Sequence, residues 1–436
     1  MNEESSGAGA PRRRYYLSTL GCPKNEVDSA KLAGRLSAAG YGEADSPGKA
    51  DLVIVNTCAF IEAAREESID TILALSAARR PGARLAVTGC LAERSGEALR
   101  AALPEVDLVA GFGQDFFSAP VAFRRRAQLP SFDLLELERP PASAPWAYVK
   151  VAEGCDRRCG FCAIPSFRGP QRSRRLDSIL AEVERLDVRE VVLIAQDLAS
   201  YGRDRGGTRQ PGEEIVRLVE AVSARTDWVR LLYLYPSALT DRLVDAICAT
   251  GVPYFDLSLQ HVSLPLLRRM RRFGGAEKVL ERIRRIRRLE PGAALRSSFI
   301  LGYPGETEED HDRLLAFLEE ADLDWAGFFT FSEEEGTYAA GLPADLRVDP
   351  SLAAARRDEC AELQDAITAK KRTSLVGSTA TVLACNGVEA RSYREAPEID
   401  GLIRIEGGLA PDERGRFLEV RLVAAEGPDL LAEVIS

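Results

Sequence analysis

The sequence predicts an α/β protein in three parts: an open parallel α/β sheet, a partial (β/α)6 barrel and a small antiparallel β-barrel. Over most of the chain, apolar runs typical of buried strands alternate with helical periodicity, which favours parallel sheets. Residues 131–145 are rich in proline and lack periodicity, so we expect a linker between two such series. Residues 377–436 change to short β-like runs broken by glycine, proline and aspartate, which predicts a separate barrel.

The chain begins with a polar segment, residues 1–13, that we expect to be a disordered lead without the apolar core of a signal peptide. No apolar run approaches the roughly 20 residues that a membrane span needs. The nine cysteines, without an export signal, favour a reducing compartment, which we take to be the cytoplasm. The formal charge of −10 argues against a protein that coats nucleic acid through its net field.

Residues 14–130 are expected to hold three strand-loop-helix units, each with a cysteine at the carboxyl end of its strand. The strands are Tyr15–Leu20, Asp51–Thr57 and Arg84–Gly89, and the cysteines are Cys22, Cys58 and Cys90. Because the carboxyl ends of parallel strands share the edge where such folds bind ligands, we expect these thiols to converge. Three thiolates suggest an iron–sulfur cluster with one open iron, and the alternative is that one of the cysteines only packs in the core.

The second domain, expected at residues 146–376, begins with a strand, Trp146–Val151, and a loop with three more cysteines. Cys155, Cys159 and Cys162 have the spacing C-x3-C-x2-C. Three soft thiolates on one short loop suit an iron–sulfur cluster, whereas a closed structural zinc site would use four ligands. One iron would stay open to a small molecule. The alternative is a partial zinc knuckle or a chance clustering of cysteines.

Strands and helices then alternate along the second domain. The expected strands are Val191–Ala195, Val229–Leu234, Phe255–Leu259, Leu295–Leu301 and Trp325–Phe331. The expected helices are Asp177–Leu186, Glu213–Arg225, Thr240–Thr250, Glu277–Leu289 and Glu308–Ala321. About six βα units make a partial barrel, whose active site is expected at the carboxyl ends of the strands, where the cysteine loop also falls.

The cysteine loop, with the aromatic Phe161 ahead of its last cysteine, resembles the signature of radical S-adenosylmethionine (SAM) enzymes. From about residue 14 onwards, nearly the whole chain resembles the methylthiotransferase family. The matching segments are Gly21–Asn25, Asn56–Cys58, Thr88–Cys90, Ile164–Pro165, Arg168–Gly169, Arg172–Arg174, Gln196–Asp197 and Gly302–Thr307. Ala30 departs from the glutamate that is common in the family, but the cluster ligands are intact.

This resemblance implies two [4Fe-4S] clusters and SAM as cofactors. The cluster on Cys155, Cys159 and Cys162 would bind SAM and cleave it reductively to a 5′-deoxyadenosyl radical, with electrons from a donor such as flavodoxin or ferredoxin. The cluster on the three N-terminal cysteines would carry the sulfur, methylated by a second SAM. The radical must meet that sulfur, so we expect the two strand-end edges to face each other.

Four further residues are expected to lie around SAM. Phe161 belongs to the loop itself, whereas Gln196, Gln260 and Arg296 stand at ends of barrel strands, where side chains line the pocket of such a barrel. A capping role is the alternative for the last three. His261 follows Gln260, and we do not expect it to titrate in catalysis.

Residues 377–436 resemble the TRAM domain that is attached to many RNA-modifying enzymes. The expected strands are Thr379–Leu383, Leu402–Ile405, Leu418–Leu422 and Leu431–Ile435. Six arginines stand against eleven acidic residues here, a net charge of −5. An RNA-binding module should present positive charge to phosphates, so this acidic barrel favours a basic protein partner, such as a ribosomal protein.

Two segments, Arg391–Gly401 and Leu259–Ser263, resemble the RimO branch of the family, which methylthiolates an aspartate β-carbon of ribosomal protein uS12. The main alternative is the MiaB branch, which modifies isopentenyladenosine in tRNA and usually has Gln-Ser in place of Gln260-His261. A non-catalytic iron–sulfur storage protein would explain the cysteines but not the long barrel. The basic segments Arg268–Arg272 and Arg282–Arg288 are expected to be a solvated face, with an RNA-docking patch as the alternative.

Overall fold

The computed structural model describes residues 13–114, 132–206 and 212–435. Apart from Arg13, the predicted N-terminal lead lies outside these residues. The chain forms two compact units: Met1–Pro140 with Ser166–Arg168, and Pro141–Pro165 with Gly169–Ser436. Within the described part of the chain, no helix combines the length and the apolar character needed to cross a membrane.

The N-terminal unit contains a parallel sheet with the strand order β2-β1-β3-β4-β5. The strands are β1 (Arg14–Thr19), β2 (Gly42–Glu43), β3 (Leu52–Thr57), β4 (Arg84–Gly89) and β5 (Leu108–Val109). The helices are α1 (Pro23–Ala38), α2 (Glu62–Ala78) and α3 (Cys90–Ala102). Thus the predicted parallel α/β sheet is confirmed. The edge strands β2 and β5 were not predicted, because two residues are too short to show a periodic pattern.

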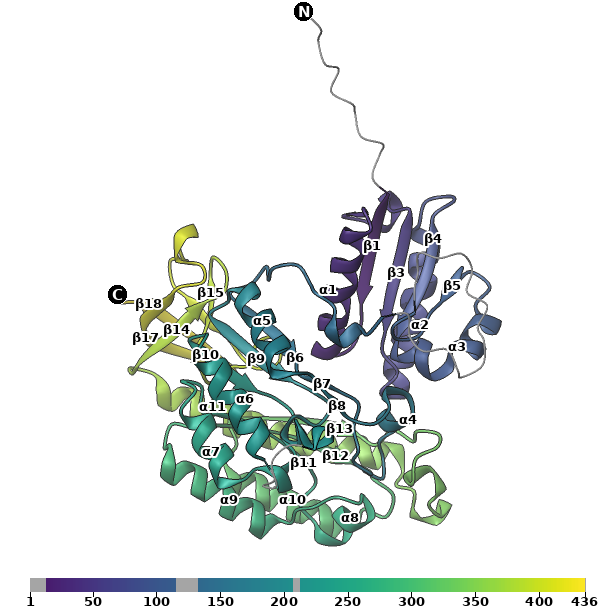
Figure 1. The fold of residues 1–436 in the computed structure, drawn as a ribbon. Coiled ribbons are helices and arrows are strands. Elements are labelled where there is room, and N and C mark those ends of the chain that lie inside the picture. Colours follow the sequence, from purple (N-terminus) through teal and green to yellow (C-terminus); the bar gives the residue numbers. More distant parts are fainter. Residues whose placement is uncertain (1–12, 115–131, 207–211, 436) are drawn as a thin grey trace, which may run out of the picture. The chain divides into compact units, whose positions relative to one another are not determined.

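Apolar side chains from both faces of this sheet build two cores. On one face, Ile54 packs with Leu32 and Leu36 of α1. On the other face, Val55 packs with Ile72 of α2 and with residues of α3. Figure 1 shows α1 on one side of the sheet, with α2 and α3 on the other side. Helices on both faces explain why β3 is buried along its whole length, as in other parallel sheets.

The second unit contains six parallel strands in two sheets, ordered β10-β9-β6 and β11-β12-β13. A parallel bridge between Leu234 and Leu257 joins them. The strands are β6 (Trp146–Lys150), β9 (Glu190–Ile194), β10 (Trp228–Leu231), β11 (Tyr254–Gln260), β12 (Ala294–Leu301) and β13 (Trp325–Thr330). The principal helices between them are α5 (Leu176–Leu186), α6 (Glu213–Ser223), α7 (Asp241–Cys248), α9 (Ala276–Leu289) and α10 (Glu308–Ala321). The predicted partial (β/α)6 barrel is therefore confirmed.

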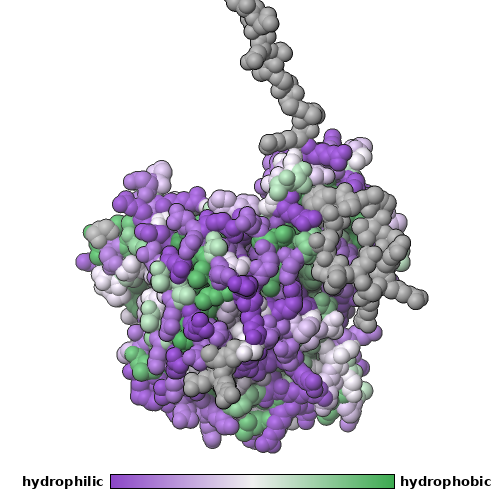
Figure 2. Space-filling model, viewed as in Figure 1, coloured by the Kyte–Doolittle hydropathy of each residue, from purple (hydrophilic) through white to green (hydrophobic). Residues whose placement is uncertain are grey.

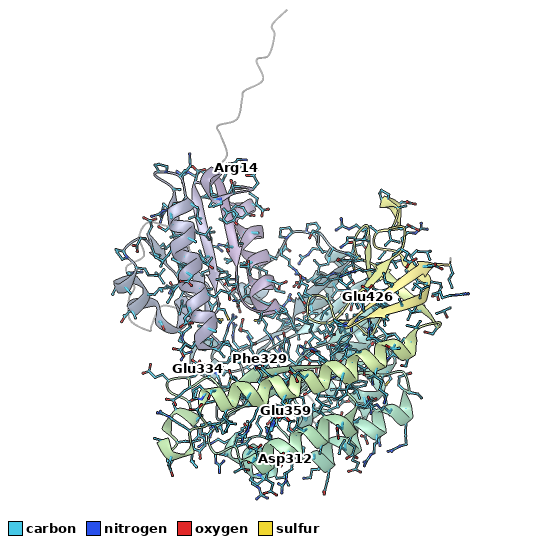
Figure 3. The ribbon with its side chains drawn as sticks, turned by 180° about the vertical axis from the view of Figure 1, so that it is seen from behind. Arg14, Asp312, Phe329, Glu334, Glu359 and Glu426 are labelled. Atoms are coloured by element: carbon cyan, nitrogen blue, oxygen red, sulfur yellow. The ribbon has the colours of Figure 1, made fainter. Side chains whose placement is uncertain are left out.

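The sequence around Cys360 shows a helical pattern, but the bounds of the long helix α11 (Pro350–Leu375) were not predicted. Its buried side is mostly polar, which hides the apolar periodicity that would mark the ends of the helix. The buried residues are Ala353, Arg356, Cys360, Gln364, Thr368 and Arg372. Figure 3 labels Glu359 on this helix and Asp312 on the neighbouring α10. The two helices are linked by the hydrogen bond between His311 Nε2 and Glu359 Oε2, 2.8 Å apart.

The C-terminal strands close into a barrel with the order β14-β15-β16-β18-β17. They are β14 (Thr379–Ala384), β15 (Glu389–Arg391), β16 (Ile403–Ile405), β17 (Phe417–Glu426) and β18 (Asp429–Val434). The predicted barrel is confirmed, but β16 and β18 pair in parallel, so the prediction of a wholly antiparallel barrel was wrong for that pair. The three-residue strand β15 was also missed.

The last residue of β15 and the segment between β15 and β16 anchor this barrel to the first residues of the (β/α)6 strands. Arg391 pairs with Glu190 of β9, and the Tyr254 hydroxyl of β11 donates to Asp400 at 2.6 Å. The indole of Trp325 in β13 donates to the Arg394 carbonyl oxygen at 2.8 Å. The segment thus covers the end of the (β/α)6 barrel opposite the carboxyl ends of its strands.

Figure 2 shows that the visible surface of the molecule is largely hydrophilic.

Candidate active site

Cys22, Cys58 and Cys90 all follow the carboxyl ends of neighbouring strands in the N-terminal sheet, as predicted. Cys22 is the N-cap of α1, and Cys90 is the first residue of α3. The positive ends of two helix dipoles therefore lie at these two sulfurs. Cys58 follows β3 and is buried. Because helix N-termini stabilise thiolates and other anions, this sheet edge suits a negatively charged cluster.

Two glycines allow the cysteine loops to approach each other. A Cβ atom on Gly21 would lie 2.9 Å from the Cys58 sulfur, and one on Gly89 would lie 2.5 Å from the Thr57 carbonyl oxygen. Both glycines also have positive φ angles, 94° and 92°. Any side chain at either position would push the strand ends apart, so the close approach depends on glycine.

Asn25 links the three strand ends. Its Nδ2 donates to the carbonyl oxygens of Leu20, at 2.8 Å, and Thr57, at 3.0 Å. Its Oδ1 lies 3.8 Å from the Cys90 sulfur. The Asn56 amide in turn donates to the Asn25 carbonyl oxygen at 2.9 Å. The sequence motifs contained both asparagines, but the positioning role of Asn25 becomes visible only when the strand ends are seen together.

Arg168 places a buried positive charge beside Cys90. Ser166–Arg168 belong to the N-terminal unit, although they follow the cysteine loop of the second domain in sequence. The guanidinium donates to the Cys90 sulfur at 3.0 Å, to Asn25 Oδ1 at 2.8 Å and to Asp28 at 3.1 Å. Although the motif Arg168–Gly169 was noted, sequence reasoning assigned the arginine no role.

The thiols of this set fit a metal cluster better than free nucleophiles. Burial raises the pKa of Cys58 to about 11, and the neighbouring Cys90 and Cys22 sulfurs add to the rise. Burial also raises the pKa of Cys90, against the opposing effect of Arg168. A bound metal would supply the positive charge that such buried thiolates need. In the described residues, no group of three or more potential ligands is placed to hold a metal ion.

The second cysteine set lies on a loop that backbone hydrogen bonds hold in place. The Cys155 amide donates to the Gly169 carbonyl oxygen at 3.1 Å, and the Gly160 amide donates to that of Met270 at 2.8 Å. Gly154 has a φ of 80°, and a Cβ there would lie 2.1 Å from the Pro170 carbonyl oxygen. The loop is therefore shaped before any cluster is bound.

Burial and neighbouring sulfurs disfavour the thiolates of Cys155 and Cys162. Burial raises the pKa of Cys155 to about 11 and that of Cys162 to about 12, and the other loop sulfurs contribute to both rises. Arg272 donates a hydrogen bond to the Cys159 sulfur at 3.2 Å. As in the first set, the thiolates need a cation, which the iron of a cluster supplies.

Gln196 lies beside the residues that lead into this loop. Its Nε2 donates to Glu153 Oε1 at 2.5 Å, while Lys150 pairs with the other carboxylate oxygen at 2.7 Å. The buried Oε1 of Gln196 has no hydrogen-bond partner among the described residues. An unsatisfied acceptor two residues past the carboxyl end of β9 fits a ligand that carries an ammonium group, such as SAM.

The other candidate residues around SAM have different surroundings. Phe161 packs against an apolar cluster that includes Met270 and Tyr303. Gln260 ends β11 with a φ of 72° next to a register shift, a strained conformation of the kind that occurs at functional sites. Arg296 is the third residue of β12, and its guanidinium pairs with Asp256 and Asp400 at 3.2 and 3.3 Å. Neither partner belongs to the cysteine loop.

Two arginine-rich segments differ in how their charge is balanced. On α9, four arginines pair with carboxylates: Arg282 and Arg285 with Asp241, Arg284 with Glu320, and Arg287 with Asp322. Around the cysteine loop, by contrast, Arg269 donates to the carbonyl oxygens of Pro304 and Gly305, and Arg271 stacks 3.7 Å from the Tyr338 ring. Arg158, Arg268 and Arg271 are exposed. The solvated-face interpretation thus fits α9, whereas the loop carries positive charge that these partners do not neutralise.

Three family models match successive parts of the chain. Residues 14–111 match the model described as "Uncharacterized protein family UPF0004". Residues 149–318 match the radical SAM superfamily, and residues 376–435 match the TRAM domain. The cysteine loop and the barrel therefore belong to a radical SAM domain, and the C-terminal barrel is a TRAM domain. Membership of this superfamily supports an iron–sulfur cluster and SAM as cofactors.

Curated relatives match the chain from end to end. Three of them bear the name ribosomal protein uS12 methylthiotransferase RimO. The protein from Cutibacterium acnes is 39% identical over 96% of this chain and 97% of its own length. Those from Anaeromyxobacter sp. strain Fw109-5 and Moorella thermoacetica are 40% identical, over 97% and 94% of this chain and 93% and 96% of their own lengths. The chain belongs to the RimO family. It is a radical SAM methylthiotransferase, and the RimO branch predicted from the sequence is favoured over the MiaB branch.

Proposed function

We propose that this RimO family member adds a methylthio group to the β-carbon of an aspartate in ribosomal protein uS12. The observation that carries the proposal is the presence of two separate sets of three cysteines. The first set follows the carboxyl ends of three parallel strands, and the second lies on the one loop that comes after β6 and the short strand at Ala152–Glu153. The relatives named above act on uS12 by name. A ribosomal substrate also agrees with the cytoplasmic location expected from the cysteine content.

The six cysteines would hold two [4Fe-4S] clusters, one on Cys22, Cys58 and Cys90 and one on Cys155, Cys159 and Cys162. With SAM bound, these groups supply the reductive cleavage of SAM and the sulfur that is transferred. In the N-terminal unit, the N-termini of α1 and α3 stabilise the negative charge of their cluster. In the radical SAM domain, we expect Gln196 Oε1 to accept a hydrogen bond from the SAM ammonium group, because this buried oxygen has no hydrogen-bond partner among the described residues. Gln260 and Phe161 remain candidates for the walls of that pocket.

We expect uS12 to dock on the TRAM domain. Three charged side chains of this domain are buried in ion pairs with the radical SAM domain and cannot attract a partner protein. They are Arg391, Glu395 and Asp400. The other ionisable residues of the domain, five arginines against nine carboxylates, are half-buried or exposed. The accessible surface therefore keeps the acidic excess that the sequence predicted, which suits a basic ribosomal protein and repels RNA phosphates.

We expect the electron donor, a flavodoxin or a ferredoxin, to bind the radical SAM domain near the cysteine loop. Arg158, Arg268 and Arg271 are exposed around the cysteine loop, and the Met270 carbonyl oxygen accepts a hydrogen bond from the Gly160 amide within the loop. An acidic electron carrier that bound these arginines would lie next to the cluster ligands. This charge complementarity would direct the two protein partners to different surfaces.

Anaerobic turnover tests the function. The reconstituted protein would be incubated with SAM, a reductant and either uS12 or tRNA, and the products would be analysed by mass spectrometry. We expect a methylthio mass increment on an aspartate of uS12 and none on tRNA. Modification of tRNA alone would overturn the proposed substrate, and the absence of any 5′-deoxyadenosine would overturn the proposed chemistry.

A further inference from the structure

Arg168 is a buried cation in direct contact with a proposed cluster ligand. Its side chain is 3% exposed and that of its partner Asp28 is 1% exposed. The face of the Phe112 ring lies 4.1 Å from the guanidinium carbon. Arg168 is thus held from three sides, by Asp28, Asn25 and Phe112, so that one Nη2 group points at the Cys90 sulfur. This geometry exceeds what a simple ion pair with Asp28 would need.

We propose that Arg168 sets the reduction potential of the cluster on Cys22, Cys58 and Cys90, an inference that rests on the proposed function. The potential of an iron–sulfur cluster rises when hydrogen bonds and positive charge act on its sulfurs, because the reduced cluster carries one more negative charge. A guanidinium in a buried site acts strongly, because little water screens it. Arg168 is a positioning residue, since it acts through the Cys90 sulfur.

Asp28 should have the opposite effect on the same cluster. Its carboxylate holds Arg168 in place, but its own negative charge lies near Cys90 and opposes reduction. Asp28 and Arg168 therefore form a pair in which loss of the cation and loss of the anion shift the potential in opposite directions. If the ion pair were purely structural, loss of either charge would weaken the fold and leave the reduction potential unchanged.

The experiment uses the full chain with Cys155, Cys159 and Cys162 replaced by alanine, so that only the N-terminal cluster is observed. After anaerobic reconstitution, a redox titration followed by electron paramagnetic resonance gives the midpoint potential. Arg168→Gln should lower the equilibrium constant for reduction about tenfold, which corresponds to about 59 mV towards more negative potential. Arg168→Lys keeps the charge but not the forked geometry and should give an intermediate potential. Asp28→Asn should shift the potential to more positive values.

The outcomes separate this proposal from the proposed function. If the cysteine-depleted parent binds no iron, the N-terminal cluster is wrong, and the role of Arg168 is wrong with it. If the parent holds a cluster and the potentials of Arg168→Gln and Asp28→Asn equal that of the parent, only the role of Arg168 is overturned. If Arg168→Gln fails to hold a cluster, Arg168→Lys and Asp28→Asn decide the question: two unchanged potentials would overturn the proposal.

Discussion

Arg391 of the TRAM domain lies 2.7 Å from Glu190 of the radical SAM barrel, and both side chains are buried. Arg230 pairs with the other carboxylate oxygen of Glu190, also at 2.7 Å. The two arginines hold the pKa of Glu190 below its usual value in spite of its burial, so the carboxylate stays charged. One carboxylate therefore balances two buried cations that come from different domains.

Glu190→Ala should destabilise the protein by about 3–5 kcal/mol, because it leaves Arg230 and Arg391 buried without a counter-charge. Equilibrium urea denaturation would measure this loss. Asp177→Ala removes a carboxylate of an exposed pair with Arg175 and serves as the matched control, with no change in midpoint expected. Equal midpoints for the two variants would show that the Glu190 network does not stabilise the junction.

Replacing Cys22, Cys58 and Cys90 by alanine should remove about half of the bound iron while SAM cleavage continues, because the radical SAM loop keeps all its ligands. Iron analysis and chromatographic detection of 5′-deoxyadenosine measure the two properties. Methylthiolated uS12 should be absent. Cys248→Ala, which changes a half-buried thiol on α7, is the control and should keep full iron. Product formation by the triple variant would contradict the role of the N-terminal set.

His261 should make the fold sensitive to acid. Burial lowers the pKa of this imidazole from 6.5 to about 4, against the opposing charge of Asp310 and with a contribution from His311 and Arg356. The unfolded chain then binds a proton that the folded chain excludes, so the stability due to His261 is lost as the pH falls from 6.5 towards 4. Its Nδ1 accepts a hydrogen bond from the Ser263 amide at 3.1 Å, which favours the neutral ring.

Between pH 7.5 and pH 5, the wild type should lose about 2 kcal/mol more stability than His261→Gln. Urea denaturation of both proteins at each pH isolates this difference, because their remaining titrating groups are the same. A difference between the two proteins that stays constant across this pH range would contradict the prediction.

Neutralising Arg158, Arg268 and Arg271 with glutamine should slow reduction by flavodoxin about tenfold at low salt, because electrostatic attraction speeds encounter. Stopped-flow absorbance of the cluster measures the rate. The control variant replaces three arginines of α9 with glutamine and so has the same change in charge. These are Arg282, Arg284 and Arg285, which pair with carboxylates of α7 and α10. Both variants should be reduced by dithionite at the wild-type rate. If flavodoxin reduced both variants equally slowly, the net charge of the protein would control the rate and the position of the arginines would not.

The sequence was most informative where chemistry and periodicity coincide. Cys58 follows an apolar run and Cys90 follows another, so both the strands and the shared sheet edge could be predicted. The side of α11 that packs against the rest of the protein carries Arg356, Gln364 and Arg372, so apolar periodicity could not mark the ends of the helix. Its buried arginines form ion pairs, such as that of Arg372 with Glu395, with partners that are distant in sequence.

The same distinction applies to the site. Gln196 was predicted from its place after a strand, and its buried Oε1 accepts no hydrogen bond from the residues that the structure describes. Arg296 was predicted by the same reasoning, but it lies near the start of β12, where Asp256 and Asp400 occupy its guanidinium. Strand position could not show this, because Asp400 comes from the TRAM domain. Arg168 was missed because its partners Asp28 and Cys90 are 140 and 78 residues away.

Ser166–Arg168 are part of the N-terminal unit, although the ribosome synthesises them after the cysteine loop of the second domain. A ribosome that has released only residues 1–140 has produced a sheet with three cysteines but not the arginine that contacts Cys90. The loop with Cys155, Cys159 and Cys162 must emerge before that arginine does. At the usual rate of translation the delay is a few seconds. The first domain to be synthesised is therefore completed only after the second has begun, and a gene fragment cut at the linker would encode an unfinished domain.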